Sequence, residues 1–480
     1  MESFIIKALQ LILSLSILVV MHELGHFAFS KLFRVRIEKF YLFFNPSFSL
    51  FRMKKIGGKW RFKWFSRNDS NVRRRYNYEG NEIEEVIPAE QLPADNWKRY
   101  PETTEWGIGW LPLGGYVKIA GMIDESFDKE QLQQSAQTWE YRSQKTWKRL
   151  LITTGGVLVN FVLALAIYSA VLFAWGNSYV EMRDTAMQFS ETALSEGFRN
   201  GDCIIAADGK DLGRFSENAI LSVFEAETVT VLRNGETITL PMPKGGLIKL
   251  AMQQKQKALM SPYLPAVVDS IMPDAPAAAV IKKGDKFLVV EKDTIHTFSE
   301  LRNFLSKNDK KSSISAIVLR GNDTLLLDIP LDDKGLIGFA PQKIIIPKTE
   351  TFDFWQSIPA GIDYGIETLA FYVHQFKYLF TKDGLLSLSG VGGFGSRFAP
   401  VWDWMSFWEN TAFLSIILAF MNILPIPALD GGHVLFLLYE MIFRRKPSDK
   451  FLIYAQTVGM ILLLALVLYA NGMDFVRAIF

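Results

Sequence analysis

Four stretches of the chain are apolar enough to cross a bilayer. They cover roughly residues 4–33, 150–175, 408–443 and 451–469. Each reaches the roughly 20 apolar residues that the hydrocarbon core requires. The third is broken between its halves, 408–424 and 433–443, by two prolines and two glycines: Pro425, Pro427, Gly431 and Gly432. Because irregular backbone at membrane depth is tolerated only where it is buried in protein or lines a wet cavity, the break indicates a site.

The distribution of charge predicts which segments face the cytoplasm. Residues 34–149 carry 21 Lys and Arg against 15 Asp and Glu, and the short segment 444–450 is also basic. Because basic loops favour the cytoplasm, we expect both segments to be cytoplasmic and residues 176–405 to lie outside. The first apolar stretch has a weakly basic start and no small-residue cleavage site, so we interpret it as a retained helix and not as a signal peptide.

A repeat occupies the segment between the second and third apolar stretches. FRNGDCIIAADGKDL (198–212) aligns with IKKGDKFLVVEKDTI (281–295). Further on, VTVLRNGETITL (229–240) matches SAIVLRGNDTLLL (315–327), and each predicts two strands around a tight turn. We expect two copies of one small α+β domain, in a pattern that resembles tandem PDZ domains. The alternative is two unrelated pieces that share a turn.

After the repeat the chain is aromatic and amphipathic from residue 352 to residue 403. Apolar residues recur there at helical spacing, which is typical of a helix that lies along a membrane surface and also of a plain linking helix. We favour the first interpretation. The chain then divides into an N-terminal membrane domain, two PDZ-like domains, an amphipathic membrane-associated linker and a C-terminal membrane domain, with predicted bounds of 1–175, 176–262, 263–348, 349–407 and 408–480.

Composition excludes several classes of protein. A net charge of +2 without basic tails argues against nucleic-acid binding. The single cysteine, Cys203, excludes an intramolecular disulfide and a cysteine-rich zinc module. Phenylalanine is abundant, at 37 residues, and the mean hydropathy is +0.13. These values fit a mixture of membrane helices and water-exposed domains.

Candidate chemistry appears inside the first apolar stretch, where His22, Glu23 and His26 form the pattern H-E-x-x-H. On a helix, positions four apart share a face, so both imidazoles can bind one metal ion. Glu23 lies beside them and can accept a proton from metal-bound water, as in zinc peptidases. Ionisable groups in a membrane helix are costly unless function or pairing offsets the cost, so hydrogen bonding across a bundle is the weaker interpretation.

A catalytic zinc needs a third protein ligand and an open position for water. We assign this role to Asp430, because it is an acidic residue within the broken third stretch, where carboxylates are expensive. His433 is the alternative ligand, and its other possible roles are a hydrogen bond or a helix start. For His296 and His374 we expect surface or core positions.

On these residues the chain resembles a known family. H-E-L-G-H in the first membrane stretch and N-I-L-P-I-P-A-L-D-G-G from Asn422 onward form the double signature of site-2 intramembrane metalloproteases. The PDZ-like pair between the two motifs is similar to that of the bacterial RseP type. The resemblance runs in order over nearly the whole chain. It implies zinc as the cofactor, with His22, His26 and Asp430 as ligands, Glu23 as the catalytic base and Asn422 near the substrate.

The resemblance also implies a membrane re-entrant β segment before the second membrane helix, which LPLGGYVKIAGM (111–122) matches. An edge strand there can pair with an unwound substrate and present its peptide bond to the metal. The alternative is an ordinary cytoplasmic hairpin. The second helix carries the family stretch GGVLVNF, which places the polar Asn160 at membrane depth. The residues expected to contact the substrate are Gly114, Gly115, Tyr116, Val117, Lys118, Asn422, Pro425 and Pro427.

Three departures from the family pattern leave the metal chemistry untouched. The second helix has Gly156-Val157 where the family commonly has Gly-Pro, and LSGVGGFGSRF (388–398) replaces the common S-G-P-V-G-I. The connection through residues 54–87 is longer than usual, and its start is basic and aromatic. That composition favours a position on anionic lipid or, almost equally, a solvated loop.

The sequence therefore predicts an α-helical integral membrane protein with four transmembrane helices, a membrane re-entrant β segment and two inserted PDZ-like α+β domains. The predicted activity is that of a zinc metalloendopeptidase. Its expected substrates are transmembrane segments of single-span proteins already trimmed outside, such as anti-sigma factors, and also remnant signal peptides. The expected partners are such a substrate and the lipid bilayer, with no nucleic acid and no small-molecule cofactor beyond zinc.

The expected location is the bacterial cytoplasmic (inner) membrane, with periplasmic PDZ-like domains and an active site toward the cytoplasmic side. Two alternatives from other classes remain. One is a membrane-tethered PDZ scaffold whose H-E-x-x-H motif is degenerate. The other is a metal transporter, in which intramembrane His and Asp mark an ion path.

Overall fold

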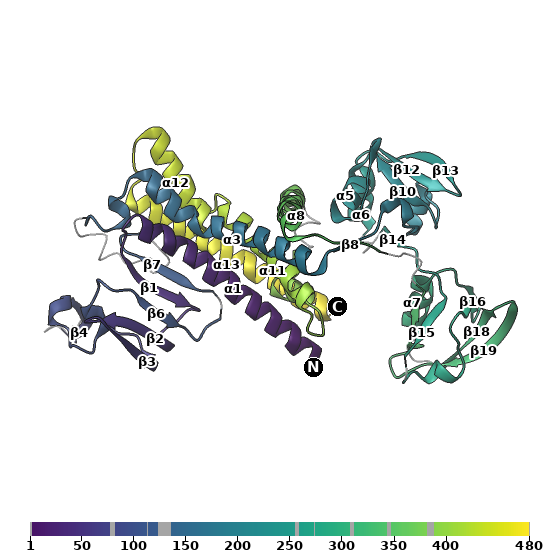
Figure 1. Ribbon diagram of the computed structural model, residues 1–480, viewed down its shortest axis with the longest axis horizontal. Coiled ribbons are helices and arrows are strands. Elements are labelled where there is room, and N and C mark those ends of the chain that lie inside the picture. The colour runs from purple at the N-terminus through teal and green to yellow at the C-terminus, as the bar shows by residue number, and fades with distance from the viewer. Residues whose placement is uncertain are drawn as a thin grey trace. The chain divides into compact units, whose positions relative to one another are not determined.

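The computed structural model describes residues 2–76, 82–112, 114–122, 136–254, 259–272, 274–307, 312–342, 347–381 and 388–479. The chain forms two compact units (Figure 1). We call Met1–Gly176 together with Thr351–Phe480 the helical unit, and Asn177–Glu350 the inserted unit.

The long helices of the helical unit follow the apolar stretches of the sequence. They are α1 (Glu2–Leu32), α3 (Thr146–Trp175), α8 (Phe354–Phe376), α11 (Trp404–Ile423), α12 (Asp430–Phe443) and α13 (Asp449–Ile479), with the short α10 (Val391–Ser396) between α8 and α11. Among the described residues, three helices are long and apolar enough to cross a membrane, over Ser3–Leu32, Thr146–Trp175 and Lys450–Arg477. These three spans agree with the sequence, while the fourth, divided between α11 and α12, remains a prediction.

Helix α3 is the centre of the bundle, because α1, α8, α11 and α12 all pack against it. The crossing with α1 is at backbone contact. A Cβ on Gly25 of α1 would collide with the carbonyl of Gly155 in α3. Close approach of this kind is the usual means by which helices associate in lipid, where burial of apolar surface offers little driving force. The crossing lies next to His26, so it fixes the motif helix against α3.

The predicted amphipathic helix after the repeat is present as α8. Asp353 caps it, accepting from the backbone of Gln356, whose side chain in turn accepts from Asp353 N–H. Its glycines at 361 and 365 face Ser169 and Leu165 of α3, so α8 packs lengthwise on α3. Its position at a membrane surface stays a prediction, and residues 382–387 of the predicted linker lie outside the described residues.

A five-stranded mixed sheet lies between α1 and α3 in the chain. Its order is β3-β2-β6-β1-β7. The strands are β1 (Ile37–Leu42), β2 (Phe48–Ile56), β3 (Lys59–Arg67), β6 (Glu105–Ile108) and β7 (Tyr116–Ile119). β1 and β7 contact α1, as Figure 1 shows, and β2 and β3 lie farther from the helices. A separate hairpin joins β4 (Val72–Tyr76) to β5 (Glu82–Val86).

The predicted β segment is strand β7 of this sheet. It pairs antiparallel with β1, far earlier in the chain, and not with a neighbouring strand, so the local-hairpin alternative is wrong. Among the described residues β7 has no second partner and forms an edge of the sheet. Leu113, within the predicted segment, lies outside the described residues. Re-entry of β7 into the membrane remains a prediction.

The inserted unit contains the repeat as two sheets of the same topology. The first, β11-β10-β12-β13, matches the second, β17-β16-β18-β19. The strands are β10 (Cys203–Ala207), β11 (Lys210–Asp211), β12 (Thr228–Arg233), β13 (Glu236–Pro241), β16 (Lys286–Val290), β17 (Asp293–Thr294), β18 (Ser313–Arg320) and β19 (Asp323–Pro330). Both hairpins predicted from the sequence are confirmed. The β12–β13 turn is Asn234-Gly235, with positive φ at both residues, as the tight turn of such a hairpin requires.

Shorter elements complete the two halves. They are β8 (Asn177–Tyr179), β9 (Met187–Phe189), α4 (Glu191–Ser195), α5 (Glu217–Glu225), α6 (Gly246–Gln254), β14 (Met260–Pro262), β15 (Val268–Ile271), α7 (Phe298–Lys307), β20 (Phe339–Pro341) and β21 (Lys348–Glu350). Buried residues form two separate cores, one from Met182 to Leu259 and one from Ala266 to Phe339. The first and last strands of the unit, β8 and β21, pair with each other, so its two ends lie together.

The Gly-Asp motif of the repeat has the same partner in both halves. Asp202 and Asp285 each accept two hydrogen bonds from an arginine of the following hairpin, Arg233 and Arg320 respectively. Burial acts to raise the pKa of Asp285, but Arg320 and the backbone N–H of Lys282 outweigh it and hold that pKa below its ordinary value. The motif is therefore a structural ion pair that ties the loop before the strand to the hairpin.

Candidate metal centre

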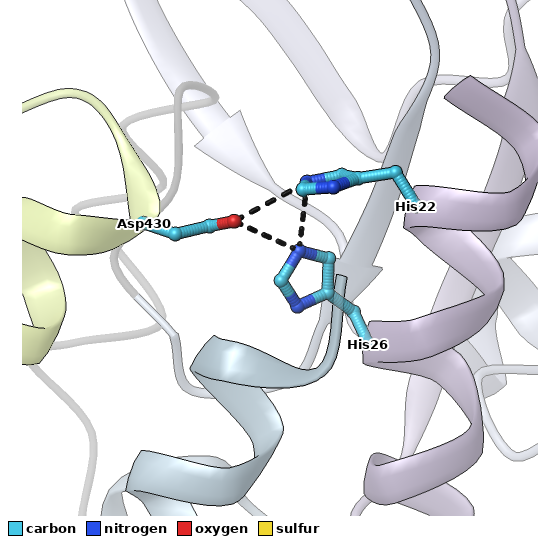
Figure 2. A group of neighbouring side chains, drawn as sticks. All are labelled: His22, His26 and Asp430. Atoms are coloured by element: carbon cyan, nitrogen blue, oxygen red, sulfur yellow. Dashed lines mark hydrogen bonds and ion pairs between the residues drawn. The ribbon is translucent and has the colours of Figure 1, made fainter. Parts of the chain in front are cut away.

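The H-E-x-x-H motif lies in α1, where helical spacing puts both histidines on one face. Their Nε2 atoms are 3.2 Å apart, and both point toward a carboxylate on a distant helix (Figure 2). That carboxylate belongs to Asp430, whose Oδ2 lies 3.2 Å from His22 Nε2 and 3.4 Å from His26 Nε2. The structure therefore brings together the three residues that the sequence singled out as metal ligands.

The broken segment between α11 and α12 positions Asp430. Helix α11 ends at Ile423, and α12 begins with Asp430 itself, three residues before the predicted restart. The connecting loop turns at Ala428, which has a φ of 83°. At the next position after Asp430, a Cβ on Gly431 would collide with the carbonyl oxygens of Ile423 and Leu424. Only glycine allows α12 to start this close to the end of α11. Gly431 therefore determines where Asp430 lies.

The donor set fits a zinc ion. Ligands at roughly 2.0–2.1 Å from zinc in a tetrahedral arrangement lie about 3.3 Å from one another. The three separations between ligand atoms, 3.2, 3.2 and 3.4 Å, match that spacing. Two imidazoles and one carboxylate are also the ligand types of catalytic zinc sites, which leave a fourth position open.

Hydrogen bonding around the three side chains supports the same reading. His26 Nδ1 donates to the carbonyl oxygen of Ile152 at 2.9 Å, which leaves the Nε2 lone pair facing the site. Asp430 Oδ2 is buried, and no hydrogen bond reaches it among the described residues. A buried carboxylate oxygen without a donor is costly, and a cation between it and the imidazoles removes that cost.

Helix α3 forms one wall of the site at Gly156. A Cβ at this position would lie 2.6 Å from both His22 Cε1 and His26 Nε2, so no larger residue fits without moving the imidazoles. One turn further along α3, the Asn160 side chain is fully buried, and both of its amide atoms lack a partner among the described residues. The sequence alone predicted Asn160 as a polar residue at membrane depth. The role of Gly156 was missed, because it depends on the α1–α3 crossing and no sequence pattern reports it.

Glu23 lies beside the metal-binding face, where its carboxylate interacts with both histidines and with Asp430. It also accepts a hydrogen bond from the backbone of Val117 in β7. This N–H therefore points away from β1, toward the motif helix. Gly115, just before β7, lies against Val19 of α1. The free edge of β7 thus runs past the H-E-x-x-H motif, one helical turn from its histidines.

The other residues expected at the substrate lie around this edge in different ways. The Tyr116 hydroxyl donates to Asn45, and Lys118 pairs with Glu38, so both side chains are engaged on the sheet. Gly114, with a φ of 143°, belongs to the turn that leads into the strand. In β7 it is the main chain, and not these side chains, that faces the site.

The loop residues of the second motif flank Asp430. Asn422 is half-buried in the last turn of α11, and its amide has no hydrogen bond among the described residues. Pro425 is exposed, whereas Pro427 packs against Gly459 of α13. The amide of Asn422 is therefore available near the start of α12, and Pro427 fixes the loop to the last helix.

His433, the alternative ligand, does not join the group of three. It lines a cavity of about 120 Å³ together with Tyr141, Arg149 and Glu440. His296 and His374 are exposed. Sequence reasoning missed the ion pair between Arg149 and Glu440, whose atoms approach to 2.5 Å and which ties α12 to the start of α3.

Comparison with known proteins agrees with this geometry. The model of peptidase family M50 matches residues 10–66 and 90–466. A protein of Vibrio cholerae named as a zinc metalloprotease is 23% identical over 97% of both chains. The metalloprotease MmpA of Caulobacter vibrioides is 22% identical over 99% of this chain and 97% of its own.

A solved structure, the PDZ domain of an SdrC-like protein of Listeria monocytogenes, matches 17% of this chain and 90% of its own at 23% identity. Its TM-score of 0.15 is too low to establish a shared fold. The family match spans both halves of the metal centre and extends over most of the helical unit. The chain belongs to peptidase family M50, the site-2 proteases, and is a membrane zinc metalloprotease.

Proposed function

We propose that His22, His26 and Asp430 hold the zinc and that the chain cleaves peptide bonds within the bilayer. The observation that carries this proposal is the convergence of three ligand atoms within 3.4 Å. Two are Nε2 atoms on α1, a helix that is apolar enough to span a membrane, and the third is the carboxylate oxygen of Asp430 on α12. A site built into such a helix meets its substrate at membrane depth. Soluble peptides have no comparable route to it.

The reaction is hydrolysis of an amide bond. When bound, zinc polarises the scissile carbonyl and lowers the pKa of water toward neutrality. Glu23 takes the proton of the attacking water and passes it to the leaving amine nitrogen as the carbon–nitrogen bond breaks. Asn422 donates its free amide to the carbonyl oxygen on which negative charge develops. Gly156, which has no side chain, leaves room for both imidazoles beside α3.

The substrate segment must be extended before it is cut, because a helical peptide bond is shielded by its own hydrogen bonds. We assign its presentation to the free edge of β7, from Gly114 to Lys118. The Val117 N–H already points at Glu23, so a substrate strand added there would run directly past the catalytic base. Pro425 and Pro427 would bound the substrate on the opposite side, next to Asn422.

The substrates we propose are single-span membrane proteins whose outer domains have been trimmed, such as anti-sigma factors, and remnant signal peptides. The inserted unit would act as a size filter through its two PDZ-like domains. We place the chain in the bacterial inner membrane, with the inserted unit periplasmic and the zinc toward the cytoplasmic side. The basic residues that follow α1 and α12 support this orientation.

The test is to map the bond that is cut. The full chain is reconstituted in vesicles with a single-span peptide that carries a helix-breaking pair in its apolar segment, and the products are sized by mass spectrometry. We expect a cut inside the apolar segment, lost on chelation and restored by zinc. Cuts confined to the exposed flanks would contradict intramembrane cleavage. Zinc flux without any cut would indicate a transporter, and peptide binding without cut or flux would indicate a scaffold.

A further inference from the structure

The two histidines of the metal centre differ in what their second ring nitrogen contacts. A neutral imidazole that offers Nε2 to a metal carries its proton on Nδ1, and this N–H needs an acceptor. His26 Nδ1 donates to the carbonyl oxygen of Ile152 at 2.9 Å. His22 Nδ1 is buried and has no hydrogen-bond partner among the described residues. The centre therefore needs an acceptor for the N–H of His22.

Helix α3 passes directly beside this nitrogen. A Cβ on Gly156 would lie 2.7 Å from His22 Nδ1 and 2.6 Å from His26 Nε2, so the glycine faces both rings. One turn earlier in α3, Ile152 supplies the acceptor for His26. One turn later, the same face of α3 carries Asn160. Gly156 thus has an acceptor for one histidine on one side and an amide side chain on the other.

The direction of the two helices puts Asn160 on the side of His22. Beyond Gly156, Leu163 of α3 packs against a buried cluster that includes Leu18 of α1. Later residues of α3 therefore meet earlier residues of α1, and Asn160 lies between the level of His22 and that of Leu18. The Cα–Cβ bonds of a helix tilt toward its N-terminus. The Asn160 side chain accordingly leans back toward Gly156 and His22.

The amide of Asn160 is itself unsatisfied. The residue is 0% exposed, and neither its amide oxygen nor its amide nitrogen has a partner among the described residues. Its backbone carbonyl accepts a hydrogen bond of 2.7 Å from Ser415 of α11, which fixes this turn of α3 in the bundle. Buried amides without partners are rare and costly. A donor on His22 and an acceptor on Asn160, both orphaned, thus lie within about one turn of α3.

We infer that Asn160 is a positioning residue for His22, whose Nδ1–H reaches the Asn160 amide oxygen through one buried water. The inference rests on the proposed function, because it takes His22 as a zinc ligand. Buried waters typically join polar groups that protein atoms leave unsatisfied. The link holds the His22 ring with Nε2 toward Asp430, as the Ile152 carbonyl does for His26. Both imidazoles are then oriented from one face of α3.

Two other roles for Asn160 fit the structure less well. A contact with substrate requires an approach path, but the side chain is fully buried, and the free edge of β7 lies at Glu23. A purely structural bond across the bundle requires a partner on another helix. The Asn160 amide has none among the described residues, although Ser415 reaches its backbone. The N–H of His22 satisfies the amide and the ring together.

Zinc affinity tests the link in the full chain, by competition with a graded chelator. Asn160→Leu keeps the approximate size of the side chain and removes the acceptor, so we expect zinc to bind about 10–100-fold more weakly. Asn160→Asp keeps an oxygen at that place and should bind zinc at least as tightly as the unchanged chain, because carboxylates commonly accept from zinc-bound imidazoles. Asn160→Ala gives a second reading if Asn160→Leu lowers the yield of folded protein.

The matched control is Ser14→Ala. Ser14 is also buried in α1, and its hydroxyl has no partner among the described residues, but it lies two turns before His22. We expect this variant to keep its zinc affinity. An equal loss of affinity in Ser14→Ala and Asn160→Leu would show a general effect of packing and overturn the role of Asn160.

The Nδ1–H signals of the zinc-loaded chain give a readout that packing alone does not move. With ¹⁵N in the imidazole rings, only five histidines contribute. We expect the signal of His22 to shift in Asn160→Leu and to stay in Asn160→Asp, while the signal of His26, bonded to Ile152, stays in both. Unchanged affinity and unchanged signals in Asn160→Leu would refute the link. Normal zinc affinity with a raised KM would mean a substrate contact instead.

The variant His22→Gln separates this inference from the proposed ligand set. Zinc retained in His22→Gln would refute His22 as a ligand, and the proposed site with it. Zinc lost in His22→Gln but bound normally by Asn160→Leu would refute only the positioning role. Loss in His22→Gln together with weakened binding in Asn160→Leu and normal binding in Ser14→Ala is the result that the link predicts.

Discussion

At the residue scale, Asp430 distinguishes this centre from a pair of histidines on a helix. His22 and His26 are fixed by the spacing of one motif, so the sequence alone places them together. Asp430 arrives from about 400 residues away, and its oxygen completes a triangle of ligand atoms with sides of 3.2 to 3.4 Å. The neighbouring His433 faces a cavity with Arg149 and Glu440 instead.

Asp430→Asn should therefore weaken zinc binding, because the amide keeps the shape but loses the charge. Groups that only orient a metal ligand change affinity by about 10–100-fold when they are mutated, so loss of a ligand should cost at least that much. The measurement is zinc content after dialysis against a graded chelator. The matched control, His433→Gln, should keep its zinc. Full zinc in Asp430→Asn together with loss in His433→Gln would move the ligand assignment to His433.

The sequence predicted these residues because their chemistry is local. Two histidines four apart and an aspartate at membrane depth are visible without a structure. Gly156 and Ile152 were not visible, since each acts only where α3 crosses α1. The carbonyl of Ile152 selects the His26 tautomer, and the missing side chain of Gly156 makes room for both rings. Such roles are properties of a helix crossing and have no signature in either helix alone.

At the element scale, α12 is held in place by the ion pair between Arg149 and Glu440. Their side chains are 9% and 12% exposed, so each charge relies on the other. Arg149 also donates to Thr146 and to the carbonyl of Gln144, which fixes it at the start of α3. Since α12 begins with Asp430, this pair links the stability of the helix to the metal centre.

Glu440→Gln should lower stability by about 3–5 kcal/mol, the usual cost of leaving a buried charge unpaired. It should also reduce zinc content, because α12 then holds Asp430 less firmly. Arg149→Met/Glu440→Leu should recover most of the lost stability, since replacing both partners by apolar side chains is often neutral. Thermal inactivation in detergent gives the comparison. Unchanged inactivation of Glu440→Gln would show that the pair is solvated and does not hold α12.

Strand β7 makes a second prediction at this scale. Val117→Pro removes the N–H that points away from β1, so it should abolish cleavage while zinc content stays normal. Val117→Ala keeps the N–H and should cleave near the normal rate. Both are measured with the same membrane peptide and with zinc analysis. If Val117→Pro cleaves as well as Val117→Ala, the main chain of β7 does not present the substrate.

The sequence predicted elements with local signals and missed contacts between distant segments. Apolar length predicted α1, α3 and α13, and the Asn-Gly turn predicted the β12–β13 hairpin, because both signals are local. The sheet around β7 was missed, since β7 pairs with β1 and β1 with β6, across long connections that no short pattern reports. The contact of α8 with α3 was missed for a similar reason. In the sequence, Gly361 and Gly365 fit a helix on a membrane surface equally well. Only the structure shows Ser169 and Leu165 of α3 opposite them.

At the scale of the whole molecule, the inserted unit can be removed without cutting an element of the helical unit. Its first and last strands, β8 and β21, pair with each other, so a short linker can join Gly176 to Thr351. We expect the shortened chain to cleave trimmed peptides at the normal rate. It should also cleave untrimmed proteins, because the proposed size filter is gone, whereas the full chain should reject them. Quantified product gels give both rates. Loss of all cleavage, with zinc retained, would instead make the inserted unit part of the catalytic core.

The central claim is that Glu23 and the zinc at His22, His26 and Asp430 cut peptide bonds inside the membrane. Single-turnover cleavage of the membrane peptide by Glu23→Gln, measured beside its zinc content, tests it most directly. Glutamine keeps the size of the side chain and cannot accept the proton of water. We predict normal zinc content and cleavage reduced by at least about 100-fold, the lower range of general-base catalysis. Cleavage at the normal rate with zinc in place would contradict the mechanism.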